Sequence, residues 1–157
     1  MRVCCFSSVL DSVLMWSHYA NAHRGVCIEY DVAALPPDDP RRYALCPVLY
    51  SEGLFDASEY LRWAREGDFN NMWFTLACLH KSPEWSYEKE WRLVVPLGPG
   101  QPHGQTISMP IKALYLGSRV PSSTKSEVLA AAAKRGLPVL KMRLVEDAFR
   151  LLAEPVS

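Results

Sequence analysis

The fold class is decided near the carboxyl end by residues 113–144, which read ALYLGSRVPSSTKSEVLAAAAKRGLPVLKMRL. Residues 122–135 predict a helix, because Pro and Ser open this segment, an Ala-rich run fills it and Gly136 ends it. The apolar segments 113–116 and 137–144 on either side predict strands. A further strand is predicted at 149–152, joined to the one before it by a hairpin.

The rest of the chain contains short apolar segments between helical and Pro-rich ones. We predict strands at 3–8, 26–30, 46–50, 91–96 and 106–109, helices at 12–21, 57–66 and 70–80, a loop at 34–42 and a hairpin turn at 98–105. The first helix is expected to begin at Asp11 or Ser12 and to end with Gly25 in the left-handed conformation.

Hairpins together with segregated helices indicate an α+β fold rather than a doubly wound one. We expect a single domain over residues 1–157, with a mostly antiparallel or mixed sheet and several packed helices. Because the chain reads as strand from its first residues, it stays open that this domain is the later part of a longer ancestral one.

Composition limits the kinds of partner. Of 157 residues, 49% are hydrophobic, which is enough for one core. Lys plus Arg and Asp plus Glu each number 17, so we expect no general affinity for nucleic acid or for a membrane surface, although a local basic patch stays open. No signal peptide is recognised, and no apolar run reaches the roughly 18 residues of a membrane helix.

The cysteines bear on the cellular compartment. There are five, an odd number, with no CxxC spacing. This pattern predicts reduced, mostly buried thiols and a cytoplasmic protein. The oligomeric state is left open.

The first unusual segment is MWSHYA at residues 15–20, followed by His23. One interpretation is that Trp16 and Tyr19 anchor a helix in the core while His18 is a hydrogen-bonded core histidine. The other is that His18 and Tyr19 project into a cleft that suits a flat, polar ligand. His18 and His23 are five residues apart and fall on different helical faces, so we expect no metal site.

The second unusual segment runs from Lys81 to Arg92 and is expected to converge with the first. If residues 87–93 are extended, Glu88, Glu90 and Arg92 share one face and the aromatic side chains share the other. That charged face is either solvated, with the aromatic side chains in the core, or it lines a cleft. In a cleft, one Glu could serve as a general base or orient a hydroxyl, with Arg92 fixing its ionisation or binding phosphate.

These segments also carry a family resemblance. Its signatures are CFS at 5–7, MWSHYA at 15–20, His23, GVCIEY at 25–30, Lys81, Trp85, YEKEWR at 87–92 and IKALYLG at 111–117. On them the chain resembles a bacterial family known as domain of unknown function twenty-nine seventy-one. Its members typically begin with an additional segment containing an Asn-Asp-Pro-Phe-like motif, which the residues before Cys5 do not contain.

A weaker resemblance concerns the order of the motifs, which is similar to that of ADP-ribosyltransferase-type domains. It implies NAD as the cofactor or substrate and a bacterial setting in phage defence or toxin action. The candidate catalytic residues are Glu90, Glu88 and His18. The candidate ligand-binding residues are Trp16, Ser17, Tyr19, Lys81, Tyr87 and Arg92.

Three hypotheses follow from these two segments. The first is an enzyme acting on a nucleotide-type substrate. The second is a non-catalytic ligand-sensing or protein-interaction domain that uses the same residues to bind a small molecule or nucleotide. The third is a structural role in which Trp16, Trp85 and Trp91 form core and the charges are solvated.

Overall fold

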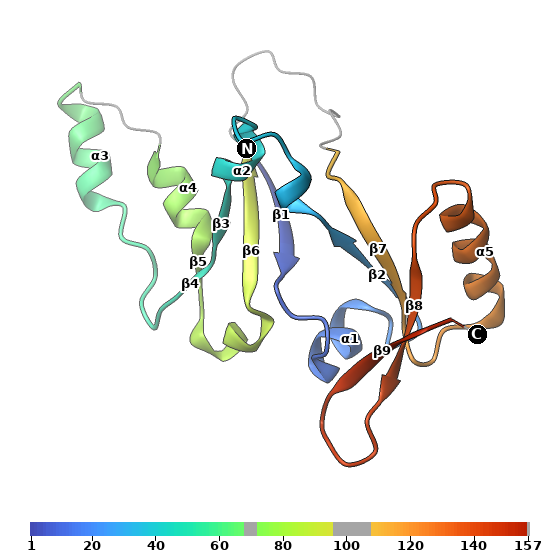
Figure 1. Ribbon diagram of the computed structural model, residues 1–157. Helices are drawn as coiled ribbons and strands as arrows, with labels where there is room; N and C mark the ends of the chain where they lie inside the picture. The colour runs from blue at the N-terminus through green and yellow to red at the C-terminus, as the bar shows by residue number, and fades with distance from the viewer. Residues whose placement is uncertain (68–71, 96–107, 157) are drawn as a thin grey trace. The chain divides into compact units, whose positions relative to one another are not determined.

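The computed structural model describes residues 1–67, 72–95 and 108–156. It contains both helices and sheets, which confirms the α+β prediction (Figure 1). The chain divides into two compact units, each made of two separate stretches of sequence. Unit 1 comprises Met1–Ser8 and Pro37–Gln105, and unit 2 comprises Val9–Pro36 and Thr106–Ser157. That the two units form one domain stays a prediction.

Unit 1 is built around a three-stranded antiparallel sheet of order β1-β6-β3. Its elements are β1 (Arg2–Ser7), α2 (Pro40–Ala44), β3 (Leu45–Pro47), β4 (Leu49–Tyr50), α3 (Ser58–Arg65), α4 (Met72–Leu79), β5 (His80–Lys81), the 3-10 helix η2 (Pro83–Glu88) and β6 (Glu90–Val95). The central strand β6 buries Leu93 and Val94. The short strands β4 and β5 form a separate parallel pair.

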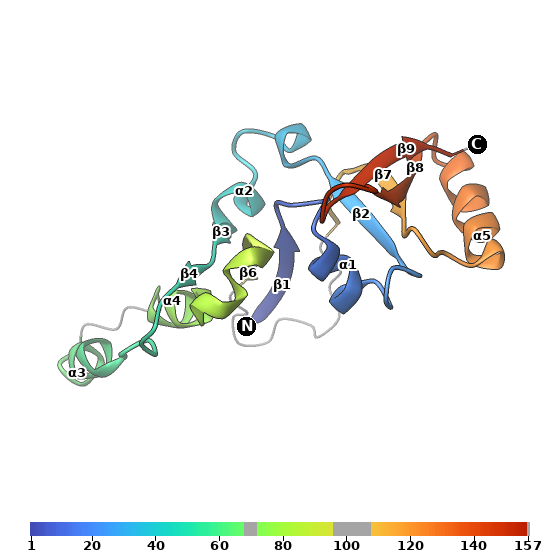
Figure 2. The ribbon, with the colours of Figure 1, turned by 90° about the horizontal axis from the view of Figure 1, so that it is seen from below.

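Unit 2 contains a mixed four-stranded sheet of order β2-β7-β8-β9. Its elements are α1 (Val13–Tyr19), β2 (Val26–Tyr30), the 3-10 helix η1 (Val32–Ala34), β7 (Ile111–Leu116), α5 (Ser122–Ala133), β8 (Val139–Leu144) and β9 (Leu151–Pro155). The strands β7 and β8 are parallel and are connected through α5, which lies beside β8 (Figures 1 and 2). Buried side chains form the core of this unit: Trp16, Ala20, Ala113, Tyr115, Met142 and Leu151.

The first helix begins as predicted but ends differently. Ser12 caps α1 by accepting a hydrogen bond from the amide of Met15. The expected left-handed Gly25 is wrong, because the left-handed residues are Asn21, Ala22 and His23, with φ of 47°, 52° and 68°. This turn closes α1 through a hydrogen bond of 3.1 Å from the amide of His23 to the carbonyl of Trp16.

Other boundaries also differ from the sequence-based prediction. The second half of the predicted loop at 34–42 is helical, because Asp39 caps α2 and Pro40 occupies its first turn. The predicted strand at 46–50 is broken at the buried Val48, whose amide binds the carbonyl of Glu90, so that β3 and β4 join different sheets. Ser108 and Met109 are not strand, and the predicted turn at 98–105 lies outside the described residues.

The cysteines are all free, but their burial was predicted wrongly. Cys4 and Cys5 are exposed, and the other three are half-buried. Both exposed thiols lie on β1, which is an edge strand of its three-stranded sheet. Among the described residues, no helix has the length and apolar character needed to cross a membrane.

Candidate functional site

The segment before β6 is not extended, contrary to the sequence-based expectation for residues 87–93. Pro83 begins the 3-10 helix η2, which ends at Glu88, and Lys89 then takes the left-handed conformation with φ 46°. Only from Glu90 does the backbone continue as strand. Glu90 and Arg92 therefore share a face of β6 by strand alternation, whereas Glu88 reaches the same place from the end of η2.

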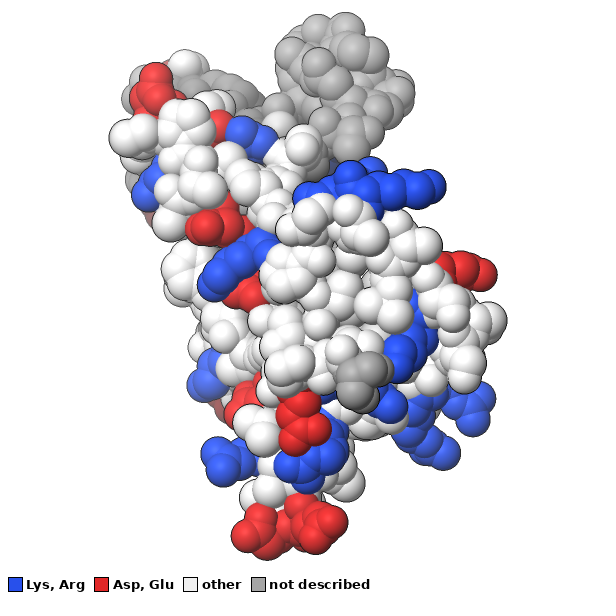
Figure 3. Space-filling view, turned by 45° about the vertical axis from the view of Figure 1, so that its right-hand side comes forward, with Lys and Arg blue, Asp and Glu red and all other residues white. Residues whose placement is uncertain are grey.

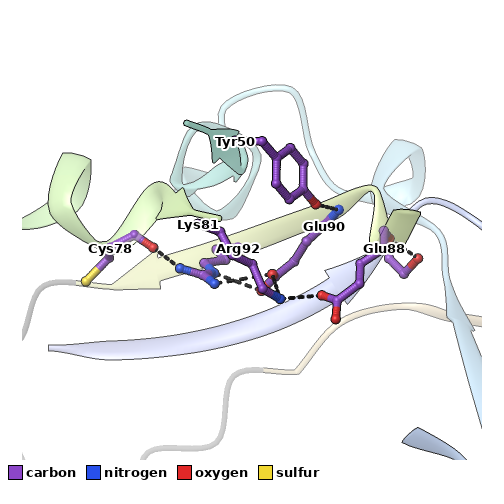
Figure 4. Close-up of polar contacts among 7 residues, drawn as sticks. Tyr50, Cys78, Lys81, Glu88, Glu90 and Arg92 are labelled. Atoms are coloured by element: carbon purple, nitrogen blue, oxygen red, sulfur yellow. Dashed lines mark hydrogen bonds and ion pairs between the residues drawn. The ribbon is translucent and has the colours of Figure 1, made fainter. Parts of the chain in front are cut away.

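Four charged side chains meet in unit 1, and we call Lys81, Glu88, Glu90 and Arg92 the ion-pair cluster (Figure 4). The Lys81 ammonium group donates to both carboxylates, with 2.8 Å between Nζ and Glu90 Oε2. Arg92 binds Glu90 through two nitrogens, with Nε 2.8 Å from Oε1 and Nη2 3.2 Å from Oε2. Its Nη1 donates to the carbonyl of Cys78.

Both carboxylates of the ion-pair cluster are buried. Glu88 is 3% exposed and Glu90 is 5% exposed, while Trp85 and Trp91 are each 38% exposed. This is the reverse of the interpretation in which the charges are solvated and these two aromatic residues form core. A buried carboxylate pays a large desolvation cost unless cations and hydrogen bonds compensate it, and the two cations of the cluster do so here.

Glu90 is held in its charged form. Burial raises its pKa, but hydrogen bonds from Arg92, Cys5 and Lys81 outweigh burial and bring the pKa to about 2. Burial also lowers the pKa of Lys81, yet its hydrogen bonds to Glu88 and Glu90 raise it overall. Glu90 is therefore suited to stabilise positive charge and unsuited to donate a proton near neutral pH.

Sequence reasoning missed three further groups around the ion-pair cluster. Cys5 lies opposite Arg92 across the β1–β6 pair. Although the residue as a whole is exposed, partial burial of its thiol and then the hydrogen bond to Glu90 raise the pKa of the thiol. The Tyr50 hydroxyl accepts the amide hydrogen of Glu90 at 2.9 Å. The third group is the Cys78 carbonyl. Cys5 stands within the CFS signature, but no local pattern places any of these three groups beside Glu90, because strand pairing and the fold of the chain bring them to the cluster from distant parts of the sequence.

Beside the cluster is an aromatic corner, formed by Lys81, Trp85 and Tyr87. The Lys81 ammonium nitrogen lies 5.0 Å from the centroid of the Trp85 ring, which is within cation–π range. The rings of Trp85 and Tyr87 are tilted, with centroids 6.1 Å apart. Trp85 remains partly exposed, so the aromatic corner has an accessible aromatic side chain next to the Lys81 ammonium group, which the two carboxylates hold in place.

The first predicted segment lies in unit 2. Trp16 is core, being 3% exposed and donating from its indole nitrogen to the carbonyl of Leu10 at 2.7 Å. His18 and Tyr19 are exposed, so the interpretation of a core histidine and a core tyrosine is wrong. Ser17 contacts His23, with 2.9 Å between Oγ and Nε2, and it also donates to the carbonyl of Val13.

The structure therefore brings together only part of the predicted site. The ion-pair cluster contains four of the predicted residues, and Tyr87 lies next to it. Trp16, Ser17, His18 and Tyr19 belong to the other unit, so their convergence with the cluster stays a prediction. Within residues 1–67, 72–95 and 108–156, no group of three or more His, Cys, Asp and Glu residues could hold a metal ion.

The fold and the ion-pair cluster define an α+β protein with buried, fully paired charge at the start of a central strand. Residues 15–93, just over half of the chain, match the model of a family described as Protein of unknown function (DUF2971). The chain belongs to this family, which is the one that its sequence motifs indicated. No curated protein and no solved structure gives a match.

Proposed function

We propose that this chain is a non-catalytic ligand-binding domain that takes a nucleotide-type molecule at the aromatic corner of unit 1. The observation that supports this is the position of Lys81, held by two buried carboxylates and directed over the partly exposed ring of Trp85. Stacking of a base on one aromatic side chain contributes about 1–3 kcal/mol. The ring is oriented before the ligand arrives, which reduces the entropy lost on binding.

The charges of the ion-pair cluster favour binding over catalysis. Two cations face two carboxylates, so the cluster has no excess charge, and both Glu90 oxygens already accept hydrogen bonds. A general base needs a carboxylate that is available to the substrate. In this proposal Glu88, Glu90 and Arg92 position Lys81 and the start of β6, while Trp85 and Tyr87 contact the ligand.

Binding to the aromatic corner can be measured by calorimetry with AMP, ADP, NAD and ADP-ribose. We expect one of these to bind, and Trp85→Ala to weaken its binding at least about tenfold through the lost stacking. Trp63→Ala is the matched control, because Trp63 lies on α3 with a similar exposure of 40%. Equal loss in both variants, or no binding by the unaltered protein, would contradict the proposal.

A second candidate is transfer of ADP-ribose from NAD in a defence or toxin-like setting. What favours it is the ionised state of Glu90, because an anionic carboxylate can stabilise the positive charge that develops on a ribosyl group. Nicotinamide release from NAD, measured in the same samples, separates the two candidates. Turnover that disappears in a folded Glu90→Gln variant supports transfer, whereas binding without turnover supports the ligand-binding domain.

A further inference from the structure

A second site is indicated in unit 2, at the point where β7 ends and its neighbour β8 continues. The two parallel strands pair from Leu114 with Val139 to Leu116 with Lys141, after which β8 continues to Leu144. A cavity of about 530 Å³ lies there. It is lined by Ser118, Arg119, Lys125, Lys141, Met142, Arg143, Leu144, Glu154, Pro155 and Val156. We call it the strand-end cavity.

Its place in the fold is one that suits a ligand. The chain passes from β7 through α5 to β8, and the cavity lies beyond the carboxyl end of β7 and along the carboxyl-terminal half of β8. In open α/β sheets, ligands bind in the crevice just beyond the carboxyl ends of the parallel strands. The sheet of unit 2 is mixed, but its single β7–α5–β8 connection has the same local arrangement. The volume also falls within the usual range of small-molecule sites, roughly 300–1,000 Å³.

The turn that forms one wall is fixed by backbone contacts. The amide of Gly117 donates to the carbonyl of Gly25 at 2.9 Å, and the amide of Arg119 donates to the carbonyl of His23 at 3.0 Å. A Cβ atom at Gly117 would lie only 2.1 Å from the His23 carbonyl oxygen, so this close approach requires glycine. Ser118 and Arg119 are consequently held at the cavity by the same contacts.

The charge of the strand-end cavity differs from that of the whole chain. The lining contains four basic residues (Arg119, Lys125, Lys141 and Arg143) and one carboxylate, Glu154, which leaves a local excess of three positive charges. The chain as a whole has a net charge of zero. Figure 3 shows Lys and Arg side chains gathered on the side of the molecule where α5 and β9 come forward.

Arg119 and Lys141, two of the four basic residues that line the cavity, are exposed there. Glu154 is paired with Arg143, with 2.8 Å between its Oε1 and the arginine Nε. No ion pair within the described part of the chain involves Arg119 or Lys141, and both side chains belong to exposed residues. Helix α5, which carries Lys125 in its first turns, adds the positive end of its dipole, since its N-cap Pro121 has no side-chain acceptor.

We propose that the strand-end cavity binds a phosphorylated small molecule. Phosphate oxygens would accept hydrogen bonds from Arg119, Lys125 and Lys141, as is usual for charge-assisted recognition of phosphate. Met142, Leu144 and Val156 would contact the apolar part of the ligand. A small molecule fits better than a nucleic acid, because the basic residues line a bounded cavity on a chain that is neutral overall.

This proposal does not rest on the proposed function, because none of the residues of the strand-end cavity belongs to the ion-pair cluster or the aromatic corner. The cavity also lies beyond residues 15–93, the range that matches the family. Variants in each unit therefore test one proposal and leave the other unaffected.

The test uses the full chain titrated with inorganic phosphate, pyrophosphate and ribose 5-phosphate at constant ionic strength. Backbone amide signals in NMR report the location, and calorimetry reports the affinity. We expect binding that shifts the amides of Ser118, Arg119 and Lys141. Lys141→Gln should weaken it at least about tenfold, since one charged contact with phosphate is lost.

The matched control is Lys134→Gln, which removes an exposed lysine at the other end of α5 that does not line the cavity. This control should leave the affinity unchanged. Arg119→Gln provides a second variant if Lys141→Gln fails to fold. Equal shifts with sodium chloride, equal weakening by the control, or binding of a single-stranded oligonucleotide without binding of any of the three phosphates would overturn the proposal.

Discussion

Glu90 is a residue whose burial is tolerated only because of its neighbours. Its two oxygens accept hydrogen bonds from Arg92 and Lys81, and both cations are themselves less than one-fifth exposed. Removing one partner from such a group leaves the others buried without compensation, which costs more than the pair contributes when it is intact. The cluster should therefore be far more sensitive to substitution than any surface pair of this chain.

We expect Glu90→Gln to lower the free energy of unfolding by about 3 kcal/mol, because Arg92 and Lys81 lose a shared counter-charge in a buried place. Urea unfolding followed by circular dichroism measures this loss. Glu59→Gln is the control, since Glu59 pairs with Arg62 on α3 and both side chains are 59% exposed. An exposed pair three residues apart contributes about 0.2–0.5 kcal/mol. A similar loss in both variants would contradict the assigned role of burial.

The sequence could identify Glu88, Glu90 and Arg92 as chemically unusual, but it could not assign them to the interior. Strand alternation predicts two faces and leaves undecided which of them is buried. Charged residues are usually exposed, which favoured the solvated interpretation, and compensation by Lys81 depends on a contact made only in the fold. The strand-end cavity was missed for a related reason, because Arg119, Lys125, Lys141 and Arg143 are scattered over a neutral chain.

At the scale of elements, the turn that follows α1 has an unusual backbone conformation. Three consecutive residues without a glycine, Asn21, Ala22 and His23, are left-handed. This conformation costs an L-residue roughly 1–2 kcal/mol, and Asn tolerates it best. The sequence pattern predicted the left-handed turn at Gly25, whereas Gly25 instead lies where a Cβ atom would come within 3.1 Å of the Ala20 backbone, which is a tight contact.

The same substitution should have opposite effects in two elements. Ala22→Gly should raise the free energy of unfolding by about 0.5–1 kcal/mol, because glycine adopts a φ of 52° without steric cost. Ala131→Gly, on an exposed position inside α5, should lower it by about 1 kcal/mol. Thermal unfolding of both variants gives the comparison. A loss of stability in both would contradict the expectation that relief of the left-handed conformation dominates at Ala22.

Glycine at position 117 is required for a different reason, which is the lack of space. Gly117→Ala would place a methyl group against the His23 carbonyl, so we expect a loss of at least about 2 kcal/mol and a lower yield of folded protein. Gly53→Ala is the control, since nothing lies within 4 Å of its Cβ position. The control should be neutral or slightly stabilising. Chemical unfolding of both variants decides between these expectations.

The helix α5 shows what local sequence can predict. Its Ala-rich interior and the stop at Gly136, which is left-handed with φ 63°, are local properties, and both were predicted. The breaks within 34–50 could not be anticipated in the same way. There, Val48 leaves the strand because it packs inside and its amide binds Glu90, and this contact joins residues that are distant in sequence.

At the scale of the whole molecule, buried charge should control the response to acid. Glu90 has a pKa of about 2 in the folded protein, against an ordinary value of 4.5. A lowered pKa stabilises the folded state above the ordinary value, and this contribution disappears as the pH falls from about 4.5 towards 2. The difference corresponds to up to about 3 kcal/mol, since one pKa unit equals about 1.4 kcal/mol.

We therefore expect the stabilities of the unaltered protein and of Glu90→Gln to converge as the pH falls. At pH 7 they should differ by about 3 kcal/mol, and near pH 2 only a small part of this difference should remain, because Glu90 is then protonated in the unfolded state and about half-protonated in the folded state of the unaltered protein. Urea midpoints measured at several pH values test this. A difference that is independent of pH would mean that the loss comes from altered packing and not from charge.

The β2–β7 pair has a consequence for how this chain could have arisen. Tyr30 at the end of β2 lies opposite Ile111 at the beginning of β7, so the two strands could be closed by an ordinary short turn. Residues 31–110 are therefore, in topology, a long insertion within a hairpin. A gene could gain or lose this insertion at one position, but the sheet of the inserted part also needs β1, which pairs with β6 and comes from before the hairpin. The segment that contains β1 and the insertion at residues 31–110 would therefore have to be gained or lost together.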